Sequence, residues 1–203
     1  MGKRQKIYVF FGLIASGKST LARAWAEQHG FLYLNTDRVR KELAGLQPTE
    51  RRPDGLGQGI YTPEFTRRTY DAMLARADEA LRRGAGGVVL DGSYSNRGER
   101  DRVRELARRH GAELLFVLCY CSEEEVARRL ALRARDPEAV SDGRWEIYLK
   151  QKEFFSMPGE LAPGELLRLD TEADITTLLT RLEQMTSGGD GQESGKEAYS
   201  PDT

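Results

Sequence analysis

The sequence predicts an α/β fold, in which a doubly wound, five-stranded parallel sheet carries helices on both of its faces. Two observations support this prediction. Apolar segments with the composition of strands alternate with helix-forming segments along most of the chain, which is typical of sheets built from strand–helix–strand units. The length of 203 residues and the apolar fraction of 39% suit a single domain with a hydrophobic core.

The expected elements follow from apolar runs and from the residues that end them. Segments rich in β-branched, aromatic and leucine residues predict strands at 7–11, 31–36, 86–91, 113–120 and 166–170. Capping residues and terminal glycines predict helices at 20–29, 37–43, 63–83, 97–110, 123–135, about 141–155 and 174–185. The glycines and prolines of 45–59 predict a loop or lid. Thr36 or Asp37 is expected to cap one helix, and Ser122 with Glu125 to form a capping box on another.

The bulk properties limit the possible partners. We expect one domain over residues 1–186 and a disordered tail over 187–203, which lacks apolar periodicity. Lys and Arg number 31 against 32 Asp and Glu, so no overall basic field indicates nucleic acid. The chain contains no apolar stretch near the roughly 20 residues of a membrane span and no signal-peptide pattern at its N-terminus. A soluble, cytoplasmic protein without a membrane partner is therefore expected.

The segment after the first predicted strand carries the most specific motif of the chain. Gly12 is followed by four residues and then by Gly17, Lys18 and Ser19, and a predicted helix begins there. This strand–turn–helix context is typical of a phosphate-binding loop. The residues expected to hold a polyphosphate, by backbone N–H groups and the helix dipole, are Gly12, Ala15, Ser16, Gly17, Lys18, Ser19 and Thr20. Lys18 is expected to reach the β- and γ-phosphates and Ser19 to bind Mg²⁺, so the motif predicts a nucleoside triphosphate as ligand.

Two acids stand at the ends of predicted strands. Asp91 ends the strand 86–91 and is expected to hold Mg²⁺, either through water or together with Ser19. Asp37 follows the strand 31–36 and is expected to accept the proton of an attacking hydroxyl or to orient that hydroxyl. Each acid also has a structural alternative, because Asp91 precedes a glycine as in many turns and Asp37 could be a plain helix cap.

Several arginines are candidates for binding charged groups. Arg40 lies one helical turn after Asp37 and could clamp an acceptor, although a solvated helix arginine would look the same. Arg133 and Arg135 precede an Asp-Pro break and are the expected lid arginines that neutralise charge in the transition state. Most of the arginines of 123–135 are expected to form an ordinary solvated face that pairs with Glu123 to Glu125. In the helix 97–110 only Arg97 and Arg100 could reach the site, with Arg100 as a candidate acceptor-binding residue, and the other arginines are expected to form an exposed, salt-bridged face.

Together these motifs resemble the P-loop kinases. The phosphate loop, Asp37-x-x-Arg40, Val-Val-Leu-Asp91-Gly-Ser with Arg100 downstream, and the Arg133/Arg135 lid are similar to the branch of polynucleotide 5′-hydroxyl kinase, gluconate kinase, chloramphenicol phosphotransferase and zeta toxin. The likeness is greatest to ATP-binding kinase modules that some bacteria fuse to an aminoglycoside-phosphotransferase-like domain. It covers about residues 6–186 and includes the segment 139–148 after the lid.

The resemblance implies a three-layer P-loop NTPase sandwich with sheet order 2-3-1-4-5, a helical lid, and ATP and Mg²⁺ as ligands. It implies that Asp37 is the base or the acceptor-binding carboxylate and that Arg133 or Arg135 is the lid arginine. It further implies that Asp170 and Thr171 lie near the adenine.

Two classes of function remain open at this point. The first is a kinase that transfers the γ-phosphoryl group of ATP to a hydroxyl of a small molecule or of a nucleic-acid end, with a toxin-type kinase acting on a sugar nucleotide as a variant. The second is a regulatory nucleotide switch without a phosphoryl acceptor. The internal arginines and Asp37 favour the first class, and the near-neutral charge disfavours a polynucleotide acceptor. The sequence does not indicate an oligomeric state.

Overall fold

The computed structural model of the chain describes residues 4–50, 57–136 and 144–187, and it contains the predicted parallel sheet. Five strands are hydrogen-bonded in the order β2-β3-β1-β4-β5, which confirms the predicted topology. The strands are β1 (Lys6–Phe11), β2 (Leu32–Asn35), β3 (Gly87–Asp91), β4 (Glu113–Tyr120) and β5 (Leu166–Asp170). All neighbouring strands run parallel, so their carboxyl ends meet at one edge of the sheet.

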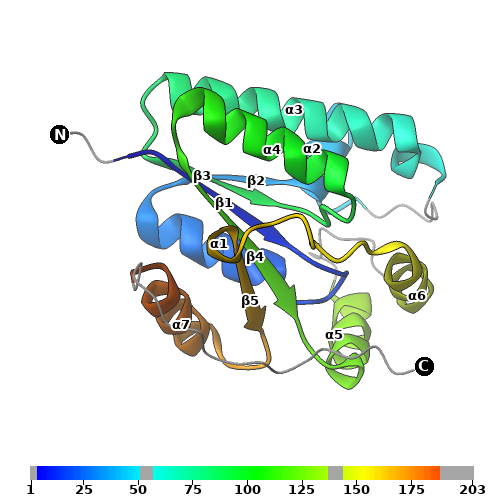
Figure 1. The fold of residues 1–203 in the computed structure, drawn as a ribbon. Coiled ribbons are helices and arrows are strands. Elements are labelled where there is room, and N and C mark those ends of the chain that lie inside the picture. The colour runs from blue at the N-terminus through cyan, green and yellow to red at the C-terminus, as the bar shows by residue number, and fades with distance from the viewer. Residues whose placement is uncertain (1–3, 51–56, 137–143, 188–203) are drawn as a thin grey trace.

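Helices cover both faces of the sheet, as Figure 1 shows. One face carries α1 (Lys18–His29) and α7 (Ile175–Ser187), and the other carries α3 (Pro63–Arg82) and α4 (Arg97–His110). The remaining elements are α2 (Thr36–Leu43), α5 (Glu123–Arg135), α6 (Trp145–Phe154) and the 3-10 turns η1 (Gly59–Tyr61) and η2 (Pro163–Glu165). Both α5 and α6 lie beyond the carboxyl ends of the strands, where a lid was predicted (Figure 1).

The alternation of side chains along β1 divides the core in two. Ile7, Val9 and Phe11 pack in the core under α3 and α4, whereas Tyr8 and Phe10 pack in the core under α1 and α7. Successive residues of a strand point to opposite faces, so an almost continuous apolar run is needed to fill both cores. This requirement explains why the first strand is recognisable in the sequence.

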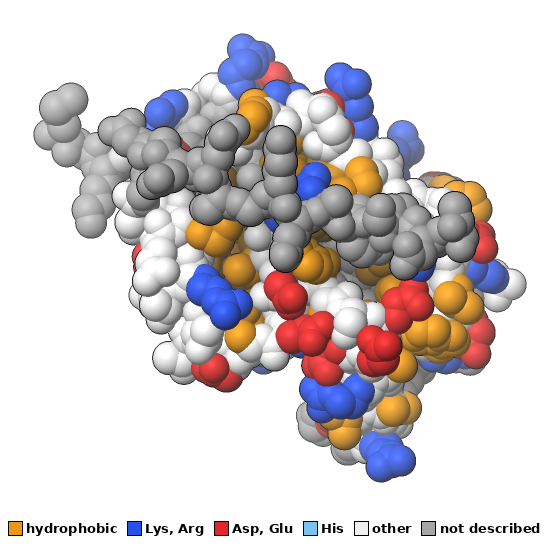
Figure 2. Space-filling view, turned by 60° about the horizontal axis from the view of Figure 1, so that its bottom comes forward, with side chains coloured by type: hydrophobic (Ala, Val, Ile, Leu, Met, Phe, Trp, Pro, Cys, Tyr) orange, Lys and Arg blue, Asp and Glu red, His pale blue; other side chains and the backbone are white. Residues whose placement is uncertain are grey.

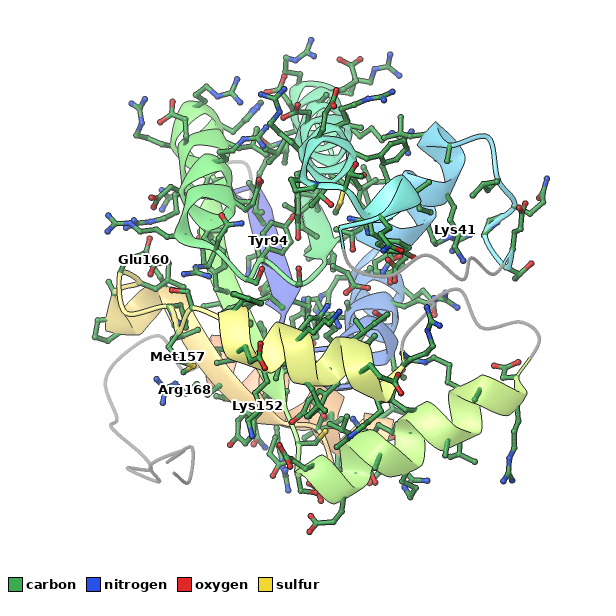
Figure 3. All side chains as sticks on the ribbon, turned by 90° about the vertical axis from the view of Figure 1, so that its right-hand side faces the viewer. Lys41, Tyr94, Lys152, Met157, Glu160 and Arg168 are labelled. Atoms are coloured by element: carbon green, nitrogen blue, oxygen red, sulfur yellow. The ribbon has the colours of Figure 1, made fainter. Side chains whose placement is uncertain are left out.

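A third, smaller apolar cluster connects the lid helices to the loop after β1. Ile14 and Ala15 of that loop pack against Val126 and Leu130 of α5 and Tyr148 of α6. Lys152 of α6 also forms an ion pair with Glu123 of α5 over 2.6 Å (Figure 3). The two lid helices therefore rest directly on the loop between β1 and α1.

Local capping chemistry sets several helix ends, and two of the cap predictions were wrong. The N-cap of α2 is Asn35, whose side chain accepts the N–H of Arg38, so neither Thr36 nor Asp37 caps that helix. Ser122 caps α5 as predicted. The capping box does not form, because the Glu125 carboxylate turns along the helix to Arg128 and Arg129.

The predicted disordered tail falls almost entirely on residues 188–203, and the predicted lid loop includes 51–56; these segments lie outside the described residues. The predicted helix 141–155 is described only from residue 144, and α6 begins at Trp145. Within the described ranges, none of the helices is long and apolar enough to cross a lipid bilayer.

Candidate functional site

The predicted phosphate loop joins β1 to α1, and its glycines occupy positions where a side chain does not fit. Gly12 has a φ of 137°, and a Cβ atom there would lie 2.3 Å from the carbonyl oxygen of Cys119. Gly17 has a φ of 79°, and a Cβ atom there would lie 2.8 Å from the Arg129 guanidinium and from the Thr171 hydroxyl. Glycine adopts such φ values at no steric cost. The loop is thus closely packed by neighbouring segments on two sides.

Lys18 begins α1 and reaches back across the loop. Its Nζ donates a hydrogen bond of 3.0 Å to the carbonyl oxygen of Leu13. Burial lowers the pKa of this ammonium group, while the carboxylates of Asp91 and Asp37 oppose the shift. Both predicted acids therefore act electrostatically on the lysine of the phosphate loop.

Asp91 ends β3 and is completely buried. Its Oδ2 accepts hydrogen bonds of 2.6 Å from the Tyr33 hydroxyl and from Nδ2 of Asn35. Its Oδ1 has no hydrogen-bond partner. Burial raises the pKa of this carboxyl group. The charge of Lys18 opposes this shift most strongly, and hydrogen bonds from neighbouring side chains oppose it to a smaller extent.

The unpaired Oδ1 of Asp91 supplies a test of the predicted Mg²⁺ site. A buried carboxylate oxygen without a donor is costly unless a cation or a water completes it. A hydrogen bond from the Ser19 side chain also lowers the pKa of Asp91, so Ser19 lies beside this carboxylate. Carboxylate and hydroxyl oxygens suit Mg²⁺, which proteins commonly bind by one or two carboxylates together with substrate phosphates. Over the described ranges no group of three or more His, Cys, Asp or Glu could hold a metal ion. One carboxylate and one hydroxyl are the kind of ligands that hold a Mg²⁺ bound together with a nucleotide.

Asp37 lies in the first turn of α2 and lines the same cleft as Asp91. Since Asn35 is the cap, the structural alternative for Asp37 does not hold. Arg40 is 7% exposed, and its Nη1 lies 3.3 Å from Oδ1 of Asp37. The same guanidinium donates to Thr66 and lies 4.8 Å from the centre of the Tyr61 ring. Arg40 thus lies behind Asp37 and is absent from the cleft lining, a position that suits orienting the carboxylate better than binding an acceptor.

An open cleft of about 860 Å³ connects these groups. It runs from the acids at the ends of β2 and β3, over the phosphate loop, to the segment between β5 and α7. The site candidates that line it are Ala15, Gly17, Lys18, Ser19, Thr20, Asp37, Asp91, Arg133 and Thr171. The cleft therefore joins most of the residues predicted for nucleotide, metal and acceptor.

The two predicted lid arginines differ in position. Arg133 lines the cleft, and burial lowers its pKa, with Asp37 acting in the opposite direction. Arg135 is exposed on α5 and does not line the cleft. Of the pair, Arg133 has the geometry expected of a lid arginine.

Arg129 pairs with Glu125, as expected for the arginines of this helix, but its guanidinium also reaches the phosphate loop, which the sequence did not predict. Its guanidinium donates to the carbonyl oxygens of Ala15, over 3.2 Å, and of Thr171, over 2.6 Å. Its Nε donates to Glu125. Arg129 precedes Arg133 by one helical turn, so the two share a face of α5, and this spacing was the available sequence signal.

The two residues predicted near the adenine differ in position, because Thr171 lines the cleft and Asp170 does not. Thr171 is 2% exposed, and its hydroxyl donates to the carbonyl oxygen of Ser16 over 2.8 Å. Asp170 lies outside the lining of the main cleft, and its carboxylate accepts the N–H of Glu172. Thr171 therefore connects the end of β5 to the phosphate loop, while Asp170 shapes the turn after it.

Arg100, a predicted acceptor-binding residue, lies fully buried away from the cleft lining. Its Nε donates to Glu160 over 2.6 Å, and its Nη1 donates to the carbonyl oxygen of Tyr94 over 2.7 Å. Figure 3 shows both partners on the side of the molecule that carries α4. Through these two contacts Arg100 connects α4 to the loop after β3 and to the segment before β5. This geometry favours a structural role over acceptor binding.

Comparison with known families gives the class of the protein. The chain matches the family AAA_33, described as an AAA domain, over residues 7–158, and it belongs to that family. It is also similar to uncharacterized proteins of Mycobacterium tuberculosis and Mycobacterium bovis, each 31% identical over 119 residues. That match covers 59% of this chain and 24% of each relative, so it spans about a quarter of the length of these curated relatives.

Solved structures share the fold at low sequence identity. A sugar kinase from Janibacter sp. has a TM-score of 0.65 and 19% identity, covering 90% of this chain and 95% of its own. A putative kinase from Chloroflexus aurantiacus has a TM-score of 0.64 and 18% identity, covering 94% of this chain and 100% of its own. A gluconokinase from Sinorhizobium meliloti has a TM-score of 0.57 and 21% identity, with the same coverage of 94% and 100%. The fold is that of the P-loop kinases.

The ion pairs of Glu125 predict a pH-dependent stability. Hydrogen bonds from Arg128 and Arg129 lower the pKa of Glu125 from 4.5 to about 2. A depressed carboxyl pKa stabilises the fold above the unfolded-state value, and this contribution disappears as the pH falls from about 4.5 towards 2. Glu125→Gln should therefore lower the free energy of unfolding at pH 7, and the difference from wild type should shrink below pH 4.5.

Chemical denaturation over this pH range measures the difference. Glu124→Gln removes the same charge from the neighbouring residue, for which the described structure shows no ion pair, and it should change the stability at pH 7 less. A Glu125→Gln difference that stays constant down to pH 3 would contradict the role given to the two arginines.

Proposed function

We propose that the protein is an ATP-dependent phosphotransferase that moves the γ-phosphoryl group of ATP to a hydroxyl of a small molecule. The observation that carries this proposal is the position of Asp37, which lines the cleft of the phosphate loop and is not the cap of its helix. A switch protein needs no such carboxylate on the acceptor side. Membership of the AAA_33 family and the kinase fold support nucleotide binding and phosphoryl transfer in general.

In this proposal the phosphate loop binds ATP through the backbone N–H groups of Ala15 to Thr20 and through Lys18. Lys18, which bonds to Leu13 in this structure, would exchange that contact for the β- and γ-phosphate oxygens. Ser19 and Asp91 would hold Mg²⁺ with the nucleotide. When bound, Mg²⁺ neutralises charge on the phosphate oxygens.

Asp37 is proposed to orient the acceptor hydroxyl and to accept its proton as its oxygen bonds to the γ-phosphorus. The bond from that phosphorus to the bridging oxygen breaks in the same displacement, and ADP leaves. Arg40 would keep the Asp37 carboxylate correctly turned through their contact of 3.3 Å. Arg133 is proposed to stabilise the charge on the transferred group, since phosphoryl transfer depends mainly on positioning and electrostatics.

We propose a polyhydroxylated small molecule as the acceptor. Two solved proteins with this fold are described as a sugar kinase and a gluconokinase, which supports this class. On the face that carries α7 and α5, acidic side chains gather near the middle and Lys and Arg side chains lie in separate places around them, so the described residues visible there form no continuous basic surface (Figure 2). A polynucleotide acceptor would need such a surface for its phosphates, so it is disfavoured.

The branch of the kinase family, the cellular location and the joining to a further domain are proposals as well. We propose that the chain belongs near the branch of the polynucleotide, gluconate and zeta-toxin kinases and acts in the cytoplasm. The greater length of the mycobacterial relatives supports the idea that such a module also occurs joined to a further domain.

Lys18→Ala should remove phosphoryl transfer while the protein still folds. The ammonium group is a fixed positive charge at the γ-phosphate, and loss of one such electrostatic group lowers kcat by about 10²-fold or more. Nucleotide affinity by calorimetry and ADP release by a coupled assay measure the effect. Wild-type turnover in this variant would refute the phosphate-loop assignment.

Asp37→Asn should retain ATP binding and lose transfer by about 10²- to 10⁴-fold, as expected for a general base. The amide keeps the size of the side chain but does not accept a proton. Asp101→Asn is the matched control, because Asp101 lies on α4 outside the cleft lining. Normal transfer by Asp37→Asn would remove Asp37 from the reaction.

The proposed function itself is tested by acceptor-dependent ADP release. A panel of aldonic acids, sugars, nucleosides, aminoglycosides and 5′-hydroxyl oligonucleotides covers the acceptor classes. We expect a polyol to stimulate ADP release by the wild-type protein. The Lys18→Ala protein should show no stimulated ADP release. Hydrolysis that no acceptor stimulates would instead favour the nucleotide switch.

A further inference from the structure

The buried carboxylate of Asp91 is held by two side chains of the neighbouring strand, and both contact the same oxygen. The Tyr33 hydroxyl and the Asn35 amide nitrogen each lie 2.6 Å from Oδ2. Oδ1 has no hydrogen-bond partner although the residue is fully buried. The two donors thus fix the rotation of the carboxylate and leave the other oxygen for a different ligand.

The register of the sheet explains why these two side chains reach Asp91. Asn35 pairs with Asp91 in the β2–β3 ladder, and Tyr33 pairs with Val89 two residues earlier. Residues two apart on a strand point to the same face, so Tyr33 and Asn35 approach Asp91 from one side. Leu34 between them points into the opposite core. An edge strand with this sequence therefore presents two polar groups to its neighbour.

Asn35 has a second contact that links it to Asp37. Its Oδ1 accepts the N–H of Arg38 over 3.0 Å and so caps α2, whose first turn contains Asp37. The amide has one accepting oxygen and one donating nitrogen, and only this orientation satisfies both the backbone N–H and the carboxylate. One side chain therefore connects the segment that carries Asp37 to the carboxylate of Asp91.

We infer that Tyr33 and Asn35 are positioning residues that hold Asp91 by Oδ2 and so leave Oδ1 for a further ligand beside the phosphate loop. Neither residue is proposed to touch the reacting atoms. The inference deepens the proposed function and rests on it, because the free oxygen matters only if Asp91 helps to hold nucleotide-bound Mg²⁺. Residues that orient a metal-binding group in this way commonly change metal affinity or activity by 10- to 100-fold when replaced.

A role in the packing of the core is the alternative, and it predicts different results. Tyr33 packs against the core under α1 and α7, so its ring contributes to stability in any case. A purely structural tyrosine would affect unfolding and nucleotide binding equally with and without Mg²⁺. A positioning tyrosine would affect chiefly the dependence on Mg²⁺. The hydroxyl alone must therefore be removed.

The experiment compares Tyr33→Phe with Tyr8→Phe. Tyr8 belongs to the same core, and the described structure shows no hydrogen bond for its hydroxyl. Binding of a fluorescent N-methylanthraniloyl derivative of ATP is titrated first in EDTA and then against increasing Mg²⁺. For Tyr33→Phe we expect affinity in EDTA within about twofold of wild type and a half-maximal Mg²⁺ concentration raised about 10-fold or more. Tyr8→Phe should behave like wild type in both titrations.

Asn35→Ser tests the second donor. Serine also caps helices well but is too short to replace the amide donor, so the variant should keep α2 and raise the Mg²⁺ requirement. Asn96→Ser makes the same change at the N-cap of α4, where Asn96 accepts the N–H of Glu99 and does not contact Asp91. That control should bind nucleotide with the Mg²⁺ dependence of wild type.

The inference is overturned if Tyr33→Phe and Asn35→Ser need no more Mg²⁺ than their controls, or if they weaken binding equally in EDTA and in Mg²⁺. Wild-type binding that rises with Mg²⁺, together with acceptor-dependent transfer, would in that case leave the proposed function intact. Wild-type protein without any Mg²⁺ dependence would overturn the metal role of Asp91 as well. Thermal unfolding by circular dichroism verifies that each variant is folded.

Discussion

The site depends on how the phosphate loop is held. Gly12 packs against the carbonyl oxygen of Cys119, and the N–H of Ile14 donates to the Gln151 side chain of α6 over 2.9 Å. On the opposite side, Arg129 and Thr171 bond to the carbonyl oxygens of Ala15 and Ser16. A loop of exposed backbone groups keeps a fixed shape only if neighbouring segments satisfy those groups. Here both lid helices and the residue after β5 supply hydrogen bonds, and β4 packs against Gly12.

This arrangement links the lid to nucleotide binding. The apolar cluster of Ile14, Ala15, Val126, Leu130 and Tyr148 packs the loop against α5 and α6. Arg133 projects from the same α5 into the cleft. A movement of α5 would therefore shift the lid arginine and the contacts of the loop together. In P-loop kinases such closure excludes water from the transferred phosphoryl group.

Several buried or part-buried charged groups have a neighbour of opposite sign. Lys18 interacts electrostatically with Asp91 and Asp37, and Arg40 forms an ion pair with Asp37. Away from the cleft, Glu160 likewise compensates the charge of the buried Arg100. A buried charge without compensation is strongly destabilising, whereas a charge that a substrate completes can be tolerated. In the proposed function, the unpaired oxygen of Asp91 is of the second kind.

The elements and the phosphate loop followed from the sequence alone, because apolar periodicity, terminal glycines and the Gly12–Ser19 spacing are local signals. The cap of α2 and the positions of Arg129 and Arg100 did not follow. Arg129 and Arg100 find partners in Ala15 and Glu160, which lie 114 and 60 residues away along the chain. Helical spacing indicates which residues share a face, but it does not indicate what that face meets.

The sequence by itself thus determined the order of strands and helices and the phosphate-binding motif, since each is encoded within a few neighbouring residues. Only the tertiary structure decided which arginine enters the cleft, which one fastens the loop, and that Tyr33 and Asn35 hold Asp91. The reason is that a parallel sheet brings together strand ends that are distant in the chain, and hydrogen bonds between them depend on register and side-chain direction.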